Sequence, residues 1–167
     1  GADTTFSAQE AAEAQTELAK AGLTVEQIMG GALAGTLSLA AAGGLDLADA
    51  ATVSANALNA FKLSGDQTTH VADLLAAAAN KSAADVSELA PALQQSALVA
   101  AQMGLTLEET TGGLAAFAQA GLKGSDAGTS FKTFLQRLVP QTEEASKAME
   151  AMGLSFFDNN GKFVGLT

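Results

Sequence analysis

Apolar residues recur at helical spacing through most of the chain. Between Thr24 and Met152, six segments carry them at i, i+3, i+4 and i+7, which is the pattern of an amphipathic helix. Glycines separate these segments, and residues 7–20 show the same pattern more weakly. Pro140 divides the longest segment into two helices. The pattern predicts an all-α fold of about seven or eight helices.

Three of the predicted helix starts share the same chemistry. Each has a leucine, then a hydroxyl residue, then Gln or Glu three residues later: Leu23-Thr24-Gln27, Leu63-Ser64-Gln67 and Leu105-Thr106-Glu109. This is the capping box, in which each side chain satisfies a backbone N–H group that the helix leaves unpaired. The leucines are 40 and 42 residues apart, a spacing that predicts three stacked helical hairpins. Duplication of an ancestral hairpin and simple recurrence of cap chemistry both account for the likeness.

Two features interrupt the helical pattern. Pro91 falls inside a helical segment, shortly after an Asp85-x-x-Glu88 capping box, and predicts that the helix kinks or restarts there. After Gly153 the apolar period changes to about two, and Asn160-Gly161 separates two short apolar runs, which favours a β-hairpin. We therefore expect a helical domain over residues 1–153 and a hairpin over 154–167. The hairpin belongs to the same domain, and because a lone hairpin is marginal in water it either docks on the helices or pairs with further chain, which we expect to continue beyond it.

Composition excludes several classes of function. The 167 residues include eight Lys and Arg against 18 Asp and Glu, so the net charge is −10, and there is no cysteine and one histidine. A disulfide scaffold, a cysteine-based metal site and a thiol nucleophile are therefore impossible. The acidic balance also disfavours direct binding to the phosphate backbone of nucleic acids.

No residue is predicted to be catalytic, to bind a cofactor or to ligate a metal. His70 has Asp66 and Asp73 as helical neighbours, so a pH-sensitive contact is one interpretation and a surface histidine among acids is the simpler one. Ser96 and Ser130 lack the strand-turn-helix elbow of a hydrolase nucleophile. The sequence therefore predicts a protein that is not an enzyme.

Other polar motifs have structural explanations. The carboxylate pairs Glu108-Glu109 and Glu143-Glu144 fall in the first turns of helices, where acids complement the helix dipole. Asp158-x-Asn160-Gly161 lacks the remaining ligands of a calcium loop and predicts a turn. Residues 121–125 lack the spacing of a phosphate loop and predict a turn that ends with Ser125 as a helix cap.

An uncharged run from Ile28 to Leu45 contains Gly31-x-x-x-Gly35 and is long enough to raise the question of a membrane span. The run consists mainly of Ala, Gly, Ser and Thr, and acids rather than Lys or Arg flank it. A buried helix with glycines where another helix crosses is the first interpretation. Membrane insertion after a conformational change is the alternative.

In order and spacing, a set of segments resembles the core region of phage tail tape measure proteins. These segments are Leu45–Ala51, Ala57–Phe61, Val71–Leu75, Ala78–Ser82, Gly104–Glu109, Ala120–Ser125, Gly153–Asp158 and Asn160–Phe163. The resemblance covers roughly residues 20–166, and the chain departs from it at Pro91 and at the glycine pairs 30–31 and 112–113.

The resemblance implies a structural virion protein that acts in tail assembly, tail-length determination and genome delivery, without cofactors. It implies tail tube proteins, tail-tip proteins and tail assembly chaperones as partners, contact with the host envelope in some members, and leaves a homo-oligomer open. The implied locations are the tail lumen, the bacterial cytoplasm during assembly and the host envelope on infection. A membrane-active or pore-forming helical module at host entry and a helical protein–protein adaptor are the alternative functions.

Overall fold

The computed structural model describes residues 6–158 and 163–164, and these residues are helical almost throughout. The helices are α1 (Ala8–Lys20), α2 (Val25–Gln27), η1 (Ile28–Ala32), α3 (Leu33–Gly43), α4 (Leu47–Phe61), η2 (Gly65–Gln67), α5 (Thr68–Asn80), α6 (Val86–Gln102), α7 (Leu107–Gln119), α8 (Gly124–Leu138) and α9 (Glu143–Ala151). α2, the π-helical η1 and α3 follow one another without a loop. The all-α prediction is confirmed.

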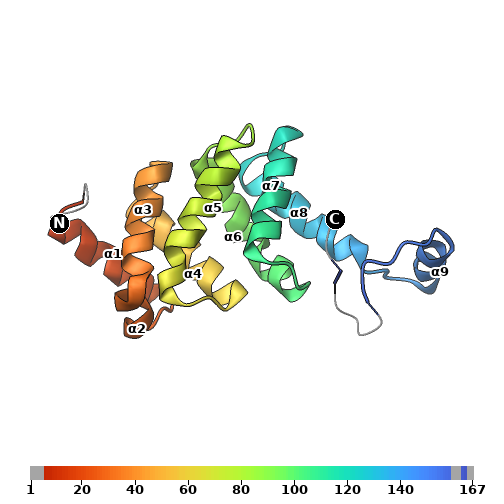
Figure 1. The fold of residues 1–167 in the computed structure, drawn as a ribbon, viewed down its shortest axis with the longest axis horizontal. Helices are drawn as coiled ribbons and strands as arrows, with labels where there is room; N and C mark the ends of the chain where they lie inside the picture. The colour runs from red at the N-terminus through yellow and green to blue at the C-terminus, as the bar shows by residue number, and fades with distance from the viewer. Residues whose placement is uncertain (1–5, 159–162, 165–167) are drawn as a thin grey trace.

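The helices form two layers that run along the molecule. α3, α5 and α7 lie side by side in the first layer, while α1, α4, α6 and α8 follow one another in the second (Figure 1). The pairs α3–α4, α5–α6 and α7–α8 are therefore stacked hairpins, the arrangement of a short helical repeat array. α9 stands apart from the layers, beyond the end of α8 (Figure 1).

The predicted capping boxes are present at all three repeated helix starts. The Thr24 and Thr106 hydroxyls accept from the N–H groups of Gln27 and Glu109, and those side chains accept from the cap N–H groups in return. Ser64 and Gln67 form the same box at η2. Local sequence thus sets where each hairpin begins.

The leucine before each box closes the preceding helix. Leu23, Leu63 and Leu105 donate their N–H groups to carbonyls five residues earlier, as the residue before each adopts a left-handed conformation. That residue is glycine at 22 and 104 but Lys62 between them, with φ 56°. Leu23 and Leu105 are buried at these turns.

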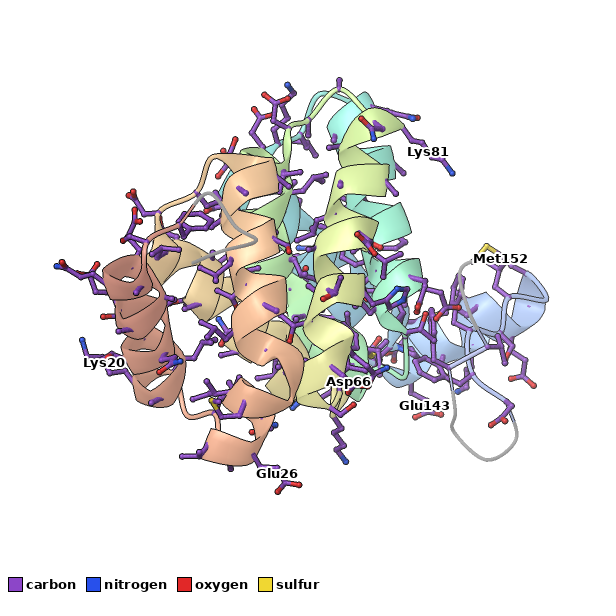
Figure 2. All side chains as sticks on the ribbon, turned by 60° about the vertical axis from the view of Figure 1, so that its left-hand side comes forward. Lys20, Glu26, Asp66, Lys81, Glu143 and Met152 are labelled. Atoms are coloured by element: carbon purple, nitrogen blue, oxygen red, sulfur yellow. The ribbon has the colours of Figure 1, made fainter. Side chains whose placement is uncertain are left out.

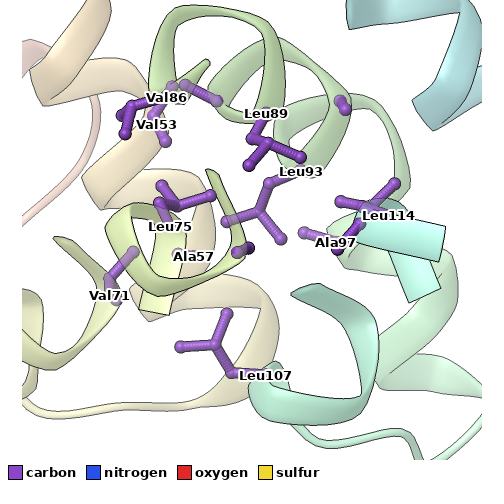
Figure 3. Close-up of a cluster of buried hydrophobic side chains, with 14 of the residues drawn as sticks. Val53, Ala57, Val71, Leu75, Val86, Leu89, Leu93, Ala97, Leu107 and Leu114 are labelled. Atoms are coloured by element: carbon purple, nitrogen blue, oxygen red, sulfur yellow. The ribbon is translucent and has the colours of Figure 1, made fainter. Parts of the chain in front are cut away.

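The main core lies between the two layers. Figure 3 shows Leu93 of α6 among side chains of the neighbouring helices, with Leu75 and Leu114 nearby, and all three leucines are fully buried. A second cluster around Leu18 and Leu58 fills the space between α1, α4 and the start of the array. Leu63 packs against both clusters and so joins them.

The predicted C-terminal β-hairpin is not supported. Among the described residues the only β interaction is a single antiparallel bridge between Phe157 and Phe163, and no strand forms. The predicted turn at Asn160-Gly161 lies outside the described residues. Phe163 is nevertheless buried in the main core, and its ring meets that of Phe157 edge-on at 5.7 Å between centroids. This segment docks through aromatic packing because one bridge supplies too few backbone hydrogen bonds to define a sheet.

The restart predicted as one alternative at Pro91 and the cap predicted at Ser125 are both wrong. α6 continues through Pro91 without a restart, because the carbonyl deprived of its partner belongs to exposed Ser87 while Ala90 and Ala92 remain buried. α8 begins at Gly124 with Lys123 as its cap residue, so Ser125 lies inside the first turn rather than capping it.

One face of the uncharged run 28–45 packs against the rest of the array, and residues such as Met29 and Ser38 are exposed. Gly31, with φ 133°, interrupts the helix within η1, and Thr36, Leu39 and Ala40 of α3 are buried. None of the helices in the described residues combines the length and the apolar character that a membrane span requires.

Candidate interaction surfaces

The candidates for catalytic chemistry lie in structural positions. The Ser96 hydroxyl is buried and donates to the Ala92 carbonyl at 2.9 Å, so it is engaged within its own helix. Ser130 lies on α8, two residues after buried Gly128. In the part of the chain that the structure describes, no three His, Asp or Glu side chains gather as they would around a metal ion.

Both carboxylate pairs lie in first turns, as the sequence indicates, but their members have different partners. Glu109 completes the Thr106 capping box, and Glu143 forms an ion pair with Lys147 at 2.7 Å. Glu108 instead reaches His70 on the neighbouring helix α5, with 2.7 Å between Oε1 and Nε2. One acid of each pair therefore holds a local partner, and only Glu108 joins two hairpins.

The His70–Glu108 contact is the feature that sequence reasoning missed. The residues are 38 positions apart, and the sequence neighbours Asp66 and Asp73 suggested a different environment for His70. The hydrogen bond from His70 lowers the pKa of the Glu108 carboxyl, with smaller help from the backbone N–H of Glu108 and the Thr106 side chain. The only feature of the sequence that pointed to the His70–Glu108 contact was the repeat spacing, which places the first turns of α5 and α7 side by side.

This contact predicts a modest pH dependence. A carboxyl whose pKa is lowered by folding stabilises the fold above its unfolded pKa, and that stabilisation is lost as the pH falls through the folded pKa. We expect Glu108→Gln to cost about 0.5 kcal/mol at pH 6 and almost nothing well below the ordinary carboxyl pKa, because exposed ion pairs contribute little. Urea unfolding at several pH values measures this difference. Glu144→Gln, at the same helical position of α9, is the control, and an equal pH-dependent loss in that variant would contradict the assignment.

Glycines bring the first-layer helices into close contact. A Cβ on Gly35 would lie 2.5 Å from the Thr69 nitrogen, and one on Gly65 would lie 2.1 Å from the Gln27 carbonyl oxygen. The backbones of α3 and α5 therefore touch at Gly35, which confirms the predicted helix crossing, and one face of α3 is buried there.

The charged side chains are distributed over the edges of the array. Figure 2 shows Glu26 and Asp66 together at one edge and Lys81 at the opposite edge. The first edge holds the capping boxes, where acids complement the N-terminal ends of the first-layer helices. The acidic residues there are explained by helix formation.

Of the nine exposed large hydrophobic side chains among the described residues, six follow α7, while Val25, Met29 and Leu98 lie elsewhere. The large hydrophobic residues exposed in this region are Leu122, Phe134, Val139, Met152, Leu154 and Val164. Phe134 belongs to a cluster of three rings, 6.2 Å from Phe117 and 6.4 Å from Phe131 between centroids. Apolar surface gathered in one region is typical of a protein–protein contact.

The segment after α8 adds a groove to this region. We call residues 139–156, which include α9, the α9 arm (Figure 1). A groove of about 420 Å³ lies between α9 and the segment that follows it, and apolar Met149, Leu154 and Phe156 contribute to its lining. The arm and the adjoining end of the array are the strongest candidate interaction surfaces.

Residues 1–167 match the family described as "Phage-related minor tail protein". This chain belongs to that family. It is 44% identical over 166 residues to the "Tape measure protein" of Pneumococcus phage Dp-1, a match that covers 99% of this chain and 14% of that protein. It is 36% identical over 161 residues to the "Probable tape measure protein" of Escherichia phage P2, covering 96% of this chain and 20% of that protein. No solved structure shows a significant match.

The chain spans less than a quarter of the length of these tape measure relatives. Membership of a tail protein family fits an array whose most distinctive surfaces are apolar contacts rather than a site for a small molecule. The resemblance inferred from the order and spacing of the sequence segments is therefore confirmed at the level of the family.

Proposed function

We propose that this chain is a structural module of a tail tape measure protein and catalyses no reaction. It acts in tail assembly, tail-length determination and genome delivery as part of a longer polypeptide. The two tape measure relatives, each matched over nearly the whole of this chain, support the assignment. The positions of Ser96 and His70 support the structural role, because Ser96 is hydrogen-bonded within its own helix and His70 contacts Glu108 on the neighbouring helix.

Within that polypeptide the module acts as a folded body. As a single continuous helix, 167 residues would extend about 250 Å, whereas the same chain folded compactly has a radius of gyration of about 15 Å. The fully buried leucines and the glycine contacts between helices favour the folded form. The module therefore adds little to a measured tail length.

The proposed partners are the proteins that a tape measure module would meet within the phage tail. They are the tail tube proteins, the tail-tip proteins and the tail assembly chaperones, with the host envelope as a contact during infection. The proposed locations are the bacterial cytoplasm during assembly and the lumen of the virion tail. The net charge of −10 disfavours a direct grip on the genome.

Duplicating the module inside the reading frame of the phage that encodes it tests the folded role. We expect tails, measured by electron microscopy, that are lengthened by far less than 250 Å per added copy. Tails lengthened by about 250 Å would show an extended segment and would overturn the folded role. In the companion deletion of residues 6–158 we expect loss of tails or of infection, and normal, infective tails would overturn the function itself.

A further inference from the structure

The two ends of the array differ in chemistry. α1 closes the N-terminal end, where it buries Ala14 and Leu18 and exposes polar side chains such as Glu13 and Thr16. Repeat arrays need such a polar terminal helix to keep their ends soluble. The C-terminal end has no equivalent helix, and it exposes Phe134 at 40% of its full area.

The C-terminal end has the surface to which a further hairpin would be added. We call Ala116, Phe117, Ala120 and Phe134, from α7, its C-terminus and α8, the end face. Leu74 of α5, 42 residues before Ala116, is half-buried against the core, whereas Ala116 is exposed. α7 packs beside α5 in the first layer, and no described helix packs beside α7 in the same way on its other side.

α9 has the sequence features of the missing helix. Thr142 caps it, as Thr106 caps α7, and the linker Val139–Thr142 is four residues long, as is the linker Met103–Thr106 between α6 and α7. α9 also carries apolar residues at helical spacing: Ala145, Ala148, Met149 and, at its C-cap, Met152. None of its residues is buried.

The chain leaves α8 in a direction that keeps α9 away from its own end face. After α6, left-handed Gly104 reverses the chain, and Leu105 bonds back to Ala100. After α8, Val139 is extended, with φ −85° and ψ 115°, and Pro140 has no N–H group to bond back. α9 therefore stands away from the layers, with Met152 out on the arm, while Phe156 at the end of the arm packs against the main core (Figures 1 and 2).

The two surfaces are complementary. The end face presents a partly exposed phenylalanine ring, and the arm presents Met152, Leu154 and the groove beside Met149. α8 carries Lys132 and Arg137 against one Asp, whereas α9 carries three Glu against one Lys. The exposed apolar side chains and the opposite net charges of α8 and α9 favour contact between them.

We propose that the α9 arm of one copy packs on the end face of a second copy, and that the two copies exchange arms in this way. An element that its own chain cannot accommodate fills the equivalent place in an identical neighbour, which is the physical basis of domain swapping. In each copy, α9 of the other copy then covers the end face and completes the array. This interface does not depend on the tail role proposed above.

Sedimentation of the purified 167-residue chain over a concentration series tests the proposal. We expect a dimer whose dissociation constant rises at least tenfold in Met152→Asp, which alters an exposed residue of the arm and so leaves the fold intact. Met29→Asp is the matched control, since this methionine is 71% exposed near the N-terminal end of the array. A monomer at all concentrations, or equal losses in both variants, would overturn the interface.

Because the chain has no cysteine, a disulfide between introduced cysteines can identify the contact directly. We expect Ala116→Cys protein mixed with Met152→Cys protein to form a covalent heterodimer on oxidation, in excess of the two homodimers. A double variant that carries both Ala116→Cys and Met152→Cys, oxidised at low concentration, shows whether the arm on an end face comes from the same chain or from a second copy. A disulfide within one chain there would show that α9 folds onto its own end face, and absence of the heterodimer would equally contradict the exchange.

Discussion

Phe131→Ala is expected to destabilise the array by about 3–5 kcal/mol, the largest effect of any substitution considered. Phe131 is fully buried on α8, and its ring meets Phe117 edge-on at 5.5 Å between centroids. Gly113 of α7 makes room for it, because a Cβ there would lie 2.7 Å from the ring. Removing the ring leaves a cavity that two rigid helices cannot close. Urea or guanidinium unfolding followed by circular dichroism measures the loss.

Phe134→Ala is the control for that substitution. Phe134 stands in the same ring cluster but is 40% exposed, so its truncation removes less buried surface and leaves no enclosed cavity. We expect a cost of about 1 kcal/mol in the monomeric chain. Equal costs at positions 131 and 134 would mean that the ring cluster is not packed as described.

Gly128→Ala is expected to destabilise the protein by about 2 kcal/mol, although alanine is the better helix former. At Gly128 the backbones of α8 and α6 touch, and an added Cβ would lie 2.3 Å from the Ala92 carbonyl oxygen. The two helices must separate to admit the methyl group, which loosens the contacts around Leu93 and Phe131. We expect the melting temperature to fall by about 4–8 °C for a chain of this size.

Gly112→Ala supplies the opposite expectation at a matched position. Gly112 lies in the middle of α7 with no atom within 4 Å of the place its Cβ would take. The substitution should raise stability by up to about 1 kcal/mol through helix propensity alone. Stabilisation by both alanines would show that α6 and α8 do not approach at Gly128.

Local chemistry accounts for what the sequence predicted correctly. A capping box or a left-handed residue acts within one helical turn, so Thr24, Thr106 and Gly104 mark their boundaries whatever lies around them. The 40- and 42-residue spacing of the leucines then indicates the hairpin array, since each hairpin needs a neighbour to cover its apolar face.

The predictions that were wrong relied on a local rule where packing dominates. Pro91 removes one hydrogen bond, but burial of Ala90, Ala92 and Leu93 on either side holds α6 together. The segment after Gly153 alternates like a strand, yet burial of Phe163 determines its place and only one bridge forms within the described residues.

By itself the sequence determined that this protein is a helical array of three capped hairpins, with no thiol chemistry, and that it resembles tail tape measure proteins. Only the tertiary structure decided which surfaces meet. The contacts between His70 and Glu108 and between Gly128 and Ala92 join residues 38 and 36 positions apart. The outward path of α9 follows from the missing left-handed turn after α8. Such contacts depend on how whole helices approach one another, and this geometry is set by the sum of many side-chain volumes rather than by any local pattern.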